Sequence, residues 1–159
     1  MRLLILHVDA FTCTLTEKSR SRLVESPIAP SAHIDVGLLV LASVEAGDEN
    51  AAEEVAMGAA GEVRELAHQL GAREVMLLPF AHLFAEPCPA DRALEIIDAT
   101  AERLRSEGFA VQRPPFGWFH TWDLKAKGHP LSRVARTIRR DAGGEEASAP
   151  DGSQSRGEG

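Results

Sequence analysis

The chain has 159 residues, of which 44% are hydrophobic and 26% charged, and a net charge of −7. This length suits one domain with a hydrophobic core and is short for two. The longest apolar run, at residues 36–44, falls far below the ~20 residues of a membrane-spanning helix, and the run at 2–8 lacks a signal-peptide cleavage site. We therefore expect a cytoplasmic protein without a membrane partner.

The first third of the chain predicts mainly strands. Residues 2–8 indicate a buried strand, and residues 11–16, which alternate apolar and polar side chains, a separate half-buried strand that pairs back on it. Residues 17–35 contain two prolines and indicate a loop. Residues 36–44 predict a second buried strand.

A helix follows, from about residue 50 to residue 70. Asn50 and Glu53 have the spacing of a capping box at its start, and Gly71 stands where a helix commonly ends. One apolar stripe at helical spacing is expected to face the core: Val55, Ala59, Val63, Leu66 and Leu70.

The second half of the domain alternates strands and helices. Residues 74–78 predict a buried strand, and residues 91–107 a second helix ended by Gly108. Strands are expected at 109–112 and 118–125, and a short terminal helix at 131–139. The pattern indicates an α/β fold with a mainly β core and two principal helices packed on it, over residues 1–140. Residues 141–159 have no large apolar side chain, which predicts a flexible acidic Gly/Ser tail or linker.

The thiols and imidazoles show no spacing typical of a disulfide or a metal site. Cys13 and Cys88 form no CxxC motif, which favours free thiols in a reducing compartment. His7 and Asp9 could join His82 or His129 around a metal ion, but ligands scattered in this way occur in almost any sequence. We expect neither a metal nor another cofactor.

Positive charge is concentrated near the end of the domain. Residues 113–140 contain seven basic residues and a single acidic one, Asp123, within an acidic protein. A solvated face is the ordinary explanation of such a run. The alternative is a phosphate-binding strip, with negative charge elsewhere limiting non-specific RNA binding.

Candidate site residues lie at the ends of the predicted strands. "HVD" (7–9) closes the first strand, "PFAHL" (79–83) follows the central one, and "PFGWFH" (115–120) opens the aromatic strand. In α/β folds ligands bind beyond strand ends, where backbone groups are free. His120, between Trp118 and Trp122, is either a catalytic base or a polar residue of an aromatic strand.

Four segments in matching order carry a resemblance to a known family: "MRLLILHVD", "LPFAHL", "EGFAV" and "PPFGWFHTWDLKAKGHPLSRVARTI". Together they resemble the amino-terminal editing domain of archaeal threonyl-tRNA synthetase, from Met1 to about Arg140. The resemblance implies a D-aminoacyl-tRNA deacylase-like fold and a homodimer. It also implies hydrolysis of serine from the 3′ end of tRNA(Thr), alongside the catalytic part of a threonyl-tRNA synthetase in cis or in trans.

Carried over by position, the resemblance implies a pocket, supporting catalytic roles for His82 and His120, and a tRNA-facing edge. The substrate-binding residues would be His7, Asp9, Val44, Pro79, Phe80, Ala81, His82, Phe116, Gly117, Trp118, Phe119 and His120. The tRNA-binding residues would be Lys127, His129, Arg133 and Arg136. Peptide groups of "PFA" and "FG" would hold adenine and the amino acid.

This sequence departs from the family inside the implied site. The family pattern has lysine at the position of His120, tyrosine at Phe119 and glutamate at Arg133. Phe119 has no proton to donate, and the guanidinium of Arg133 cannot act as a base. In the family mechanism the 2′-OH of the terminal ribose helps to activate the attacking water, and chemistry of that kind tolerates changed side chains where backbone geometry is kept.

Three alternatives remain open on the sequence. The chain is also compatible with a free-standing D-aminoacyl-tRNA deacylase, or with a catalytically degenerate module that binds tRNA or a synthetase. An unrelated small α/β binding domain would make the resemblance accidental. The sequence does not distinguish a complete protein from an excised domain.

Overall fold

The computed structural model describes residues 1–83 and 86–140, with only the backbone at His82. The tail expected at 141–159 lies outside these residues. The elements, in chain order, are β1 (Arg2–Lys18), β2 (Ser31–Ile34), β3 (Gly37–Ser43), η1 (Asp48–Ala51), α1 (Ala52–Leu70), β4 (Glu74–Pro79), η2 (Ala81–Leu83), α2 (Ala90–Ser106), β5 (Ala110–Gln112), β6 (Trp118–Ala126) and β7 (Arg133–Thr137).

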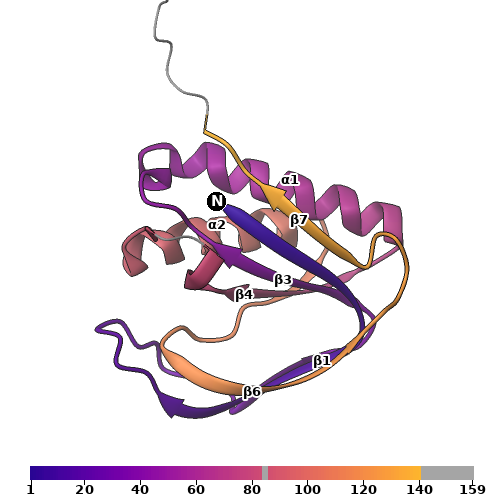
Figure 1. The fold of residues 1–159 in the computed structure, drawn as a ribbon, viewed down its shortest axis with the longest axis horizontal. Helices are drawn as coiled ribbons and strands as arrows, with labels where there is room; N and C mark the ends of the chain where they lie inside the picture. Colours follow the sequence, from indigo (N-terminus) through magenta and orange to yellow (C-terminus); the bar gives the residue numbers. More distant parts are fainter. Residues whose placement is uncertain (84–85, 141–159) are drawn as a thin grey trace, which may run out of the picture.

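The strands form one sheet in which β3, β4 and β5 run parallel and β1 is antiparallel to β3. Parallel neighbours need crossover connections, and α1 and α2 provide them. Both helices lie on the same side of the sheet (Figure 1). Among the described residues, no helix combines the length and apolar character needed to cross a membrane.

β1 is one long strand, so the prediction of two separate strands at 2–8 and 11–16 was wrong. Its register with β6 shifts between Val8 and Ala10, which marks a bulge at Asp9. A bulge bends a strand and increases its twist. The first half of β1 pairs with β3 and β7, and the second half turns back beneath the sheet to pair with β2 and β6 (Figure 1).

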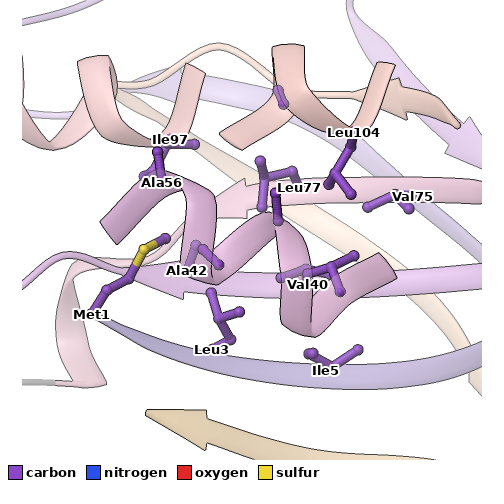
Figure 2. Packing of buried hydrophobic residues seen from close by; sticks show 14 of the residues in the cluster. Met1, Leu3, Ile5, Val40, Ala42, Ala56, Val75, Leu77, Ile97 and Leu104 are labelled. Atoms are coloured by element: carbon purple, nitrogen blue, oxygen red, sulfur yellow. The ribbon is translucent and has the colours of Figure 1, made fainter. Parts of the chain in front are cut away.

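The bend of β1 creates a core on each face of the sheet. Figure 2 shows the first, where Val40 and Leu77 of the sheet meet Ala56 and Leu104 of the helices. The second holds alternate residues of the same strands together with the folded-back half of β1: Val8, Phe11, Cys13, Ile34, Leu39, Leu41, Met76 and Leu78. Every residue of β3 is buried as a result, which explains its continuous apolar run.

The ends of the two long helices agree only partly with the sequence. Gly71 ends α1 in the left-handed conformation, as predicted. The prediction of a capping box at Asn50 and Glu53 was wrong, because η1 precedes α1 and no side chain caps the N-terminus of the helix. Here the carboxylates of Asp48 and Glu49 accept backbone N–H groups of Glu45 and Gly47, and so order the entrance turn.

Two further predictions were wrong because strand pairing decided the conformation. The helix expected at 131–139 is β7, which pairs with the first half of β1 and buries Val134. The loop expected at 17–35 contains β2, which pairs with Phe11 to Thr14 of β1. Cys13 and Cys88 are free, buried thiols.

Candidate functional site

A cavity of about 330 Å³ opens where β4 ends and β6 begins. We call it the histidine pocket. Residues 78–81 and 114–120 line it, together with Ser19 and Trp122. The "PFA" and "PFG" segments, far apart in the sequence, therefore meet across one cavity. Their position beyond strand ends is the usual place for a ligand in an α/β fold.

A second cavity, of about 230 Å³, adjoins the first. We call it the apolar pocket, because Val44, Cys88, Leu94 and Ile97 contribute to its lining. Residues 79–81 and Phe116 line both cavities. The two pockets together can hold a ligand with one flat apolar part and one polar part. Burial raises the pKa of the Cys88 thiol to about 12, so this sulfur stays protonated and is no nucleophile at neutral pH.

The "PFG" segment is held rigidly by Glu25. The carboxylate of Glu25 accepts the Phe116 N–H at 2.7 Å, and its own N–H donates to the Phe116 carbonyl at 3.0 Å. Arg113 forms a bidentate ion pair with Glu25 and also bonds Asp98 at 2.7 Å. The hydrogen bonds from Arg113 lower the pKa of Glu25 below its usual range. A charged buttress of this kind fixes the loop that lines the cavity.

Gly117 allows this loop to approach residues 23–24. Its φ of 91° lies in the left-handed region. A Cβ at this position would lie 2.6 Å from the carbonyl oxygen of Leu23. Both the conformation and the close contact require glycine.

The "PFA" segment is tied to β3. The Phe80 N–H donates to Ala42 O at 2.8 Å, and the hydroxyl of Ser43 donates to Phe80 O. The backbone N–H groups of Phe80 and Phe116 are thus used inside the protein. Among the described residues, the N–H groups of Ala81 and Gly117 form no hydrogen bond, and both residues line the histidine pocket.

His120 lines the histidine pocket, and Trp122 determines which nitrogen of its ring carries the proton. The indole Nε1–H of Trp122 donates to His120 Nδ1 at 2.6 Å, with the rings nearly parallel. Trp122 is itself held edge-on by the buried Phe11, with 5.7 Å between ring centroids. With Nδ1 accepting, the neutral imidazole carries its proton on Nε2. Burial lowers the pKa of His120, so at neutral pH the ring offers an N–H donor and no free lone pair.

His7 and Asp9 lie in a different cluster, away from the two pockets. His7 Nδ1 is 2.8 Å from His129 Nε2, and Asp9 forms an ion pair with Lys127 at 2.6 Å. In the β1–β6 ladder Leu15 is opposite His120, whereas Val8 is opposite Ala126. The structure therefore separates the "HVD" and "KGHPL" residues from the "PFA" and "PFG" residues by most of the ladder.

Much of the positive charge of residues 113–140 is paired. Lys127 meets Asp9, Arg136 meets Glu62 and Arg140 meets Asp48. Arg133 is exposed and has no ion pair within the described residues. The side chain of His82 lies outside the described part of the chain.

Sequence reasoning missed Glu25 and the hydrogen bond from Trp122 to His120. Glu25 lies in a segment expected to be a plain loop, and nothing near it in the sequence signals its contact with Phe116. No sequence pattern predicted the hydrogen bond that Trp122, packed edge-on against Phe11, donates to His120. The sequence held one signal for the contact between Trp122 and His120. The two residues are two positions apart along a strand, so their side chains share a face.

The chain matches the family described as the archaea-specific editing domain of threonyl-tRNA synthetase over residues 1–138. It is 38% identical over 141 residues to a threonine–tRNA ligase of Thermococcus onnurineus and 34% identical over 142 residues to one of Methanopyrus kandleri. These alignments cover 87% and 89% of this chain, but only 22% and 23% of the relatives.

A solved structure of a c-Myc DNA unwinding element binding protein has the same fold, with a TM-score of 0.60 and 13% identity over 88% of this chain and 100% of that one. The fold is D-aminoacyl-tRNA deacylase-like. Because the family match spans residues 1–138 and relatives exceed 30% identity, the chain belongs to the archaea-specific editing domains of threonyl-tRNA synthetase.

Proposed function

We propose that this chain proofreads threonine tRNA by hydrolysing the ester between L-serine and the terminal adenosine. The observation that carries the proposal is the meeting of the "PFA" and "PFG" segments around two adjoining pockets. A synthetase needs such a step because threonine exceeds serine by one methyl group. A difference of this size gives only about 10- to 200-fold discrimination in binding.

The two pockets suit the two parts of the substrate. The apolar pocket, beside Val44 and Ile97, suits the face of adenine. The histidine pocket suits the ribose and the seryl ester, with the free N–H groups of Ala81 and Gly117 and the Nε2–H of His120 as donors. We also keep His82, next to Ala81 in the chain, as a proposed supporting residue beside the ribose.

The proposed reaction is ordinary ester hydrolysis with help from the substrate. Water attacks the seryl carbonyl carbon while the 2′-OH of the terminal ribose helps to remove its proton. The carbonyl oxygen becomes an oxyanion that the N–H donors stabilise. The ester bond to the 3′ oxygen then breaks, that oxygen receives a proton, and free serine leaves. In this reaction His120 stands where the family has a lysine and donates a hydrogen bond to the oxyanion. No side chain has to act as a base.

Parallel deacylation assays test the proposal. We expect L-seryl-tRNA(Thr) to be hydrolysed and L-threonyl-tRNA(Thr) to be spared, and a tRNA ending in 2′-deoxyadenosine to lose far more activity than a His120→Ala variant. Preferential hydrolysis of D-aminoacyl esters would assign the chain as a D-aminoacyl-tRNA deacylase instead. Binding of tRNA without turnover would identify a degenerate module.

The proposed partners follow from the family. The curated relatives are more than four times as long as the matched segment, which supports joint action with a synthetase catalytic part, in cis or in trans. We also propose a homodimer, which sedimentation or light scattering of the purified chain tests directly. Lys127, His129, Arg133 and Arg136 remain proposed contacts with tRNA outside the two pockets.

A further inference from the structure

A short basic segment lies beside the histidine pocket, and no part of the family motifs includes it. The segment, residues 18–22, begins at the last residue of β1 and is called the basic loop here. It contains Lys18, Arg20 and Arg22, and all three are exposed. In Figure 1 the end of β1 and the start of β6 lie together at the lower left, where this loop departs.

Both ends of the basic loop lie close to Gly117. The Ser19 N–H donates to Gly117 O at 2.8 Å, and Ser19 also lines the histidine pocket. Just beyond the loop, Leu23 O lies 2.6 Å from the position that a Cβ on Gly117 would occupy. Arg20 and Arg22 are thus confined to a short excursion from the rim of the cavity.

The basic loop keeps its charge available. Within the described residues Lys18, Arg20 and Arg22 form no ion pair, in contrast to Lys127 and Arg136. Glu17 is the neighbouring carboxylate in the sequence, and Glu25, further on, is already neutralised by Arg113. The rim of the histidine pocket is therefore locally positive within a chain of net charge −7.

Aromatic rings accompany these cations. The Lys18 ammonium lies 5.6 Å from the centre of the Trp118 ring. The next residue, Phe119, also lines the pocket and is 57% exposed. Surfaces that bind single-stranded nucleic acid combine cations that follow the phosphates with aromatic rings on which bases stack.

We propose that the basic loop binds the phosphates of the single-stranded nucleotides that precede the terminal adenosine, and that Phe119 offers a stacking surface to one of their bases. This inference rests on the proposed function, because it requires the terminal adenosine to occupy the two pockets. The unpaired end of a tRNA suits this surface, since the pockets admit one nucleoside and the preceding phosphates must cross the rim.

Two substrates of different length test the basic loop. One is the seryl ester of adenosine, which has no phosphate, and the other is the same ester on an oligonucleotide ending in CCA. We expect the extension to raise kcat/KM of the unaltered protein at least tenfold at low salt. The double variant Arg20→Ala/Arg22→Ala should lose most of this gain, and the negative slope of log(kcat/KM) against log[salt] should become shallower by about 0.7 per phosphate contact removed.

Two further variants make the test specific. Arg73→Ala removes an exposed arginine between α1 and β4, and should leave both substrates unaffected. If Arg133→Ala/Arg136→Ala abolishes the gain and the loop variant does not, the basic loop is not the phosphate contact. Equal losses on both substrates would likewise overturn the proposal.

The two levels of inference fail in different ways. If no seryl ester is hydrolysed by the unaltered protein, the proposed function is wrong. The basic loop is still tested by fluorescence anisotropy with an uncharged CCA oligonucleotide, where the loop variant should bind at least tenfold more weakly. Equal affinity of the two proteins would reject it.

Discussion

His120 shows how one neighbour defines the chemistry of a residue. A histidine in a cavity invites the role of general base, which requires a free lone pair on the nitrogen that faces the substrate. The Trp122 N–H occupies Nδ1 and leaves the proton on Nε2. The neutral His120 ring therefore carries a hydrogen-bond donor at Nε2, which corresponds more closely to the donor role of a lysine than to a base.

Replacing His120 separates a donor from a base. His120→Gln keeps an N–H donor and cannot accept a proton at neutral pH, so we expect it to retain kcat within about threefold. His120→Ala should lower kcat about tenfold, as the loss of one hydrogen bond to a developing charge implies. Single-turnover deacylation of seryl-tRNA measures both. Equal and large losses of kcat in the two variants would show that His120 acts as a base.

Replacing Trp122 should change kcat in opposite directions, depending on whether His120 is a hydrogen-bond donor or a base. Trp122→Phe keeps the ring on Phe11 and removes the N–H that holds the tautomer. If His120 is a donor, kcat falls; if it is a base, releasing Nδ1 raises kcat. We expect a fall of about three- to tenfold. The ¹⁵N chemical shifts of His120 show which ring nitrogen is protonated. We expect the proton on Nε2 in the unaltered protein. Thr121→Val, on the other face of β6, controls for disturbance of the strand.

At the scale of elements, the site depends on loops that other elements hold. The "PFG" segment is positioned by Glu25 from the β1–β2 connection, which bonds Phe116 directly, and by Asp98 from α2 through Arg113. The "PFA" segment is positioned by Ala42 and Ser43 of β3. The segments that line the cavities are thus fixed by residues outside those segments.

Gly117 and Gly108 provide a matched pair of substitutions. Their φ angles are 91° and 93°, so alanine meets a similar conformational cost of about 1–2 kcal/mol at either position. Only at Gly117 would the new Cβ also collide with Leu23, since nothing lies within 4 Å of it at Gly108. We expect Gly117→Ala to be the less stable in urea unfolding and to lose over tenfold in kcat/KM. Activity equal to that of Gly108→Ala would contradict the importance of this contact.

The elements also show what local patterns can predict. The two long helices follow from their periodicity, and for α1 also from Gly71, while the buried strands β3 and β4 follow from continuous apolar runs; all of these are local signals. β7 was mistaken for a helix because its sequence, which includes Val134 and Ala135, has no strong period of its own. Its conformation comes from pairing with the open side of β1, which is a contact between the two ends of the domain.

For the molecule as a whole, His7 and His120 are expected to make stability depend on pH below neutrality. The pKa of His7 is lowered by burial first and then by the nearby His129 and Lys127, with Asp9 opposing. Its Nδ1 faces His129, and its Nε2 is buried without a partner among the described residues. Protonation therefore places charge in a site that favours the neutral ring.

The expected pH dependence follows from this shift. Because the pKa values of His7 and His120 are lower in the folded protein than the ordinary 6.5, the unfolded chain binds more protons below that pH. The free energy of unfolding should therefore decrease as pH falls from about 7 to 5. Asp9 and Glu25 have pKa values lowered from 3.8 and 4.5, so their contribution is lost only in more acidic solution. Urea midpoints at pH 5, 6 and 7 measure the effect, which His7→Gln should reduce. A midpoint independent of pH in this range would contradict it.

The amino-acid sequence by itself determined the class of fold, the buried strands, the two helices and the "PFA" and "PFG" segments, since each depends on residues close together in the chain. Only the tertiary structure decided which of these segments contact one another. The bulge at Asp9 folds β1 back on the sheet, and the β1–β6 ladder then separates His7 from His120 while Glu25 reaches Phe116. Contacts between distant segments depend on the summed packing of the whole core, and no local pattern specifies them.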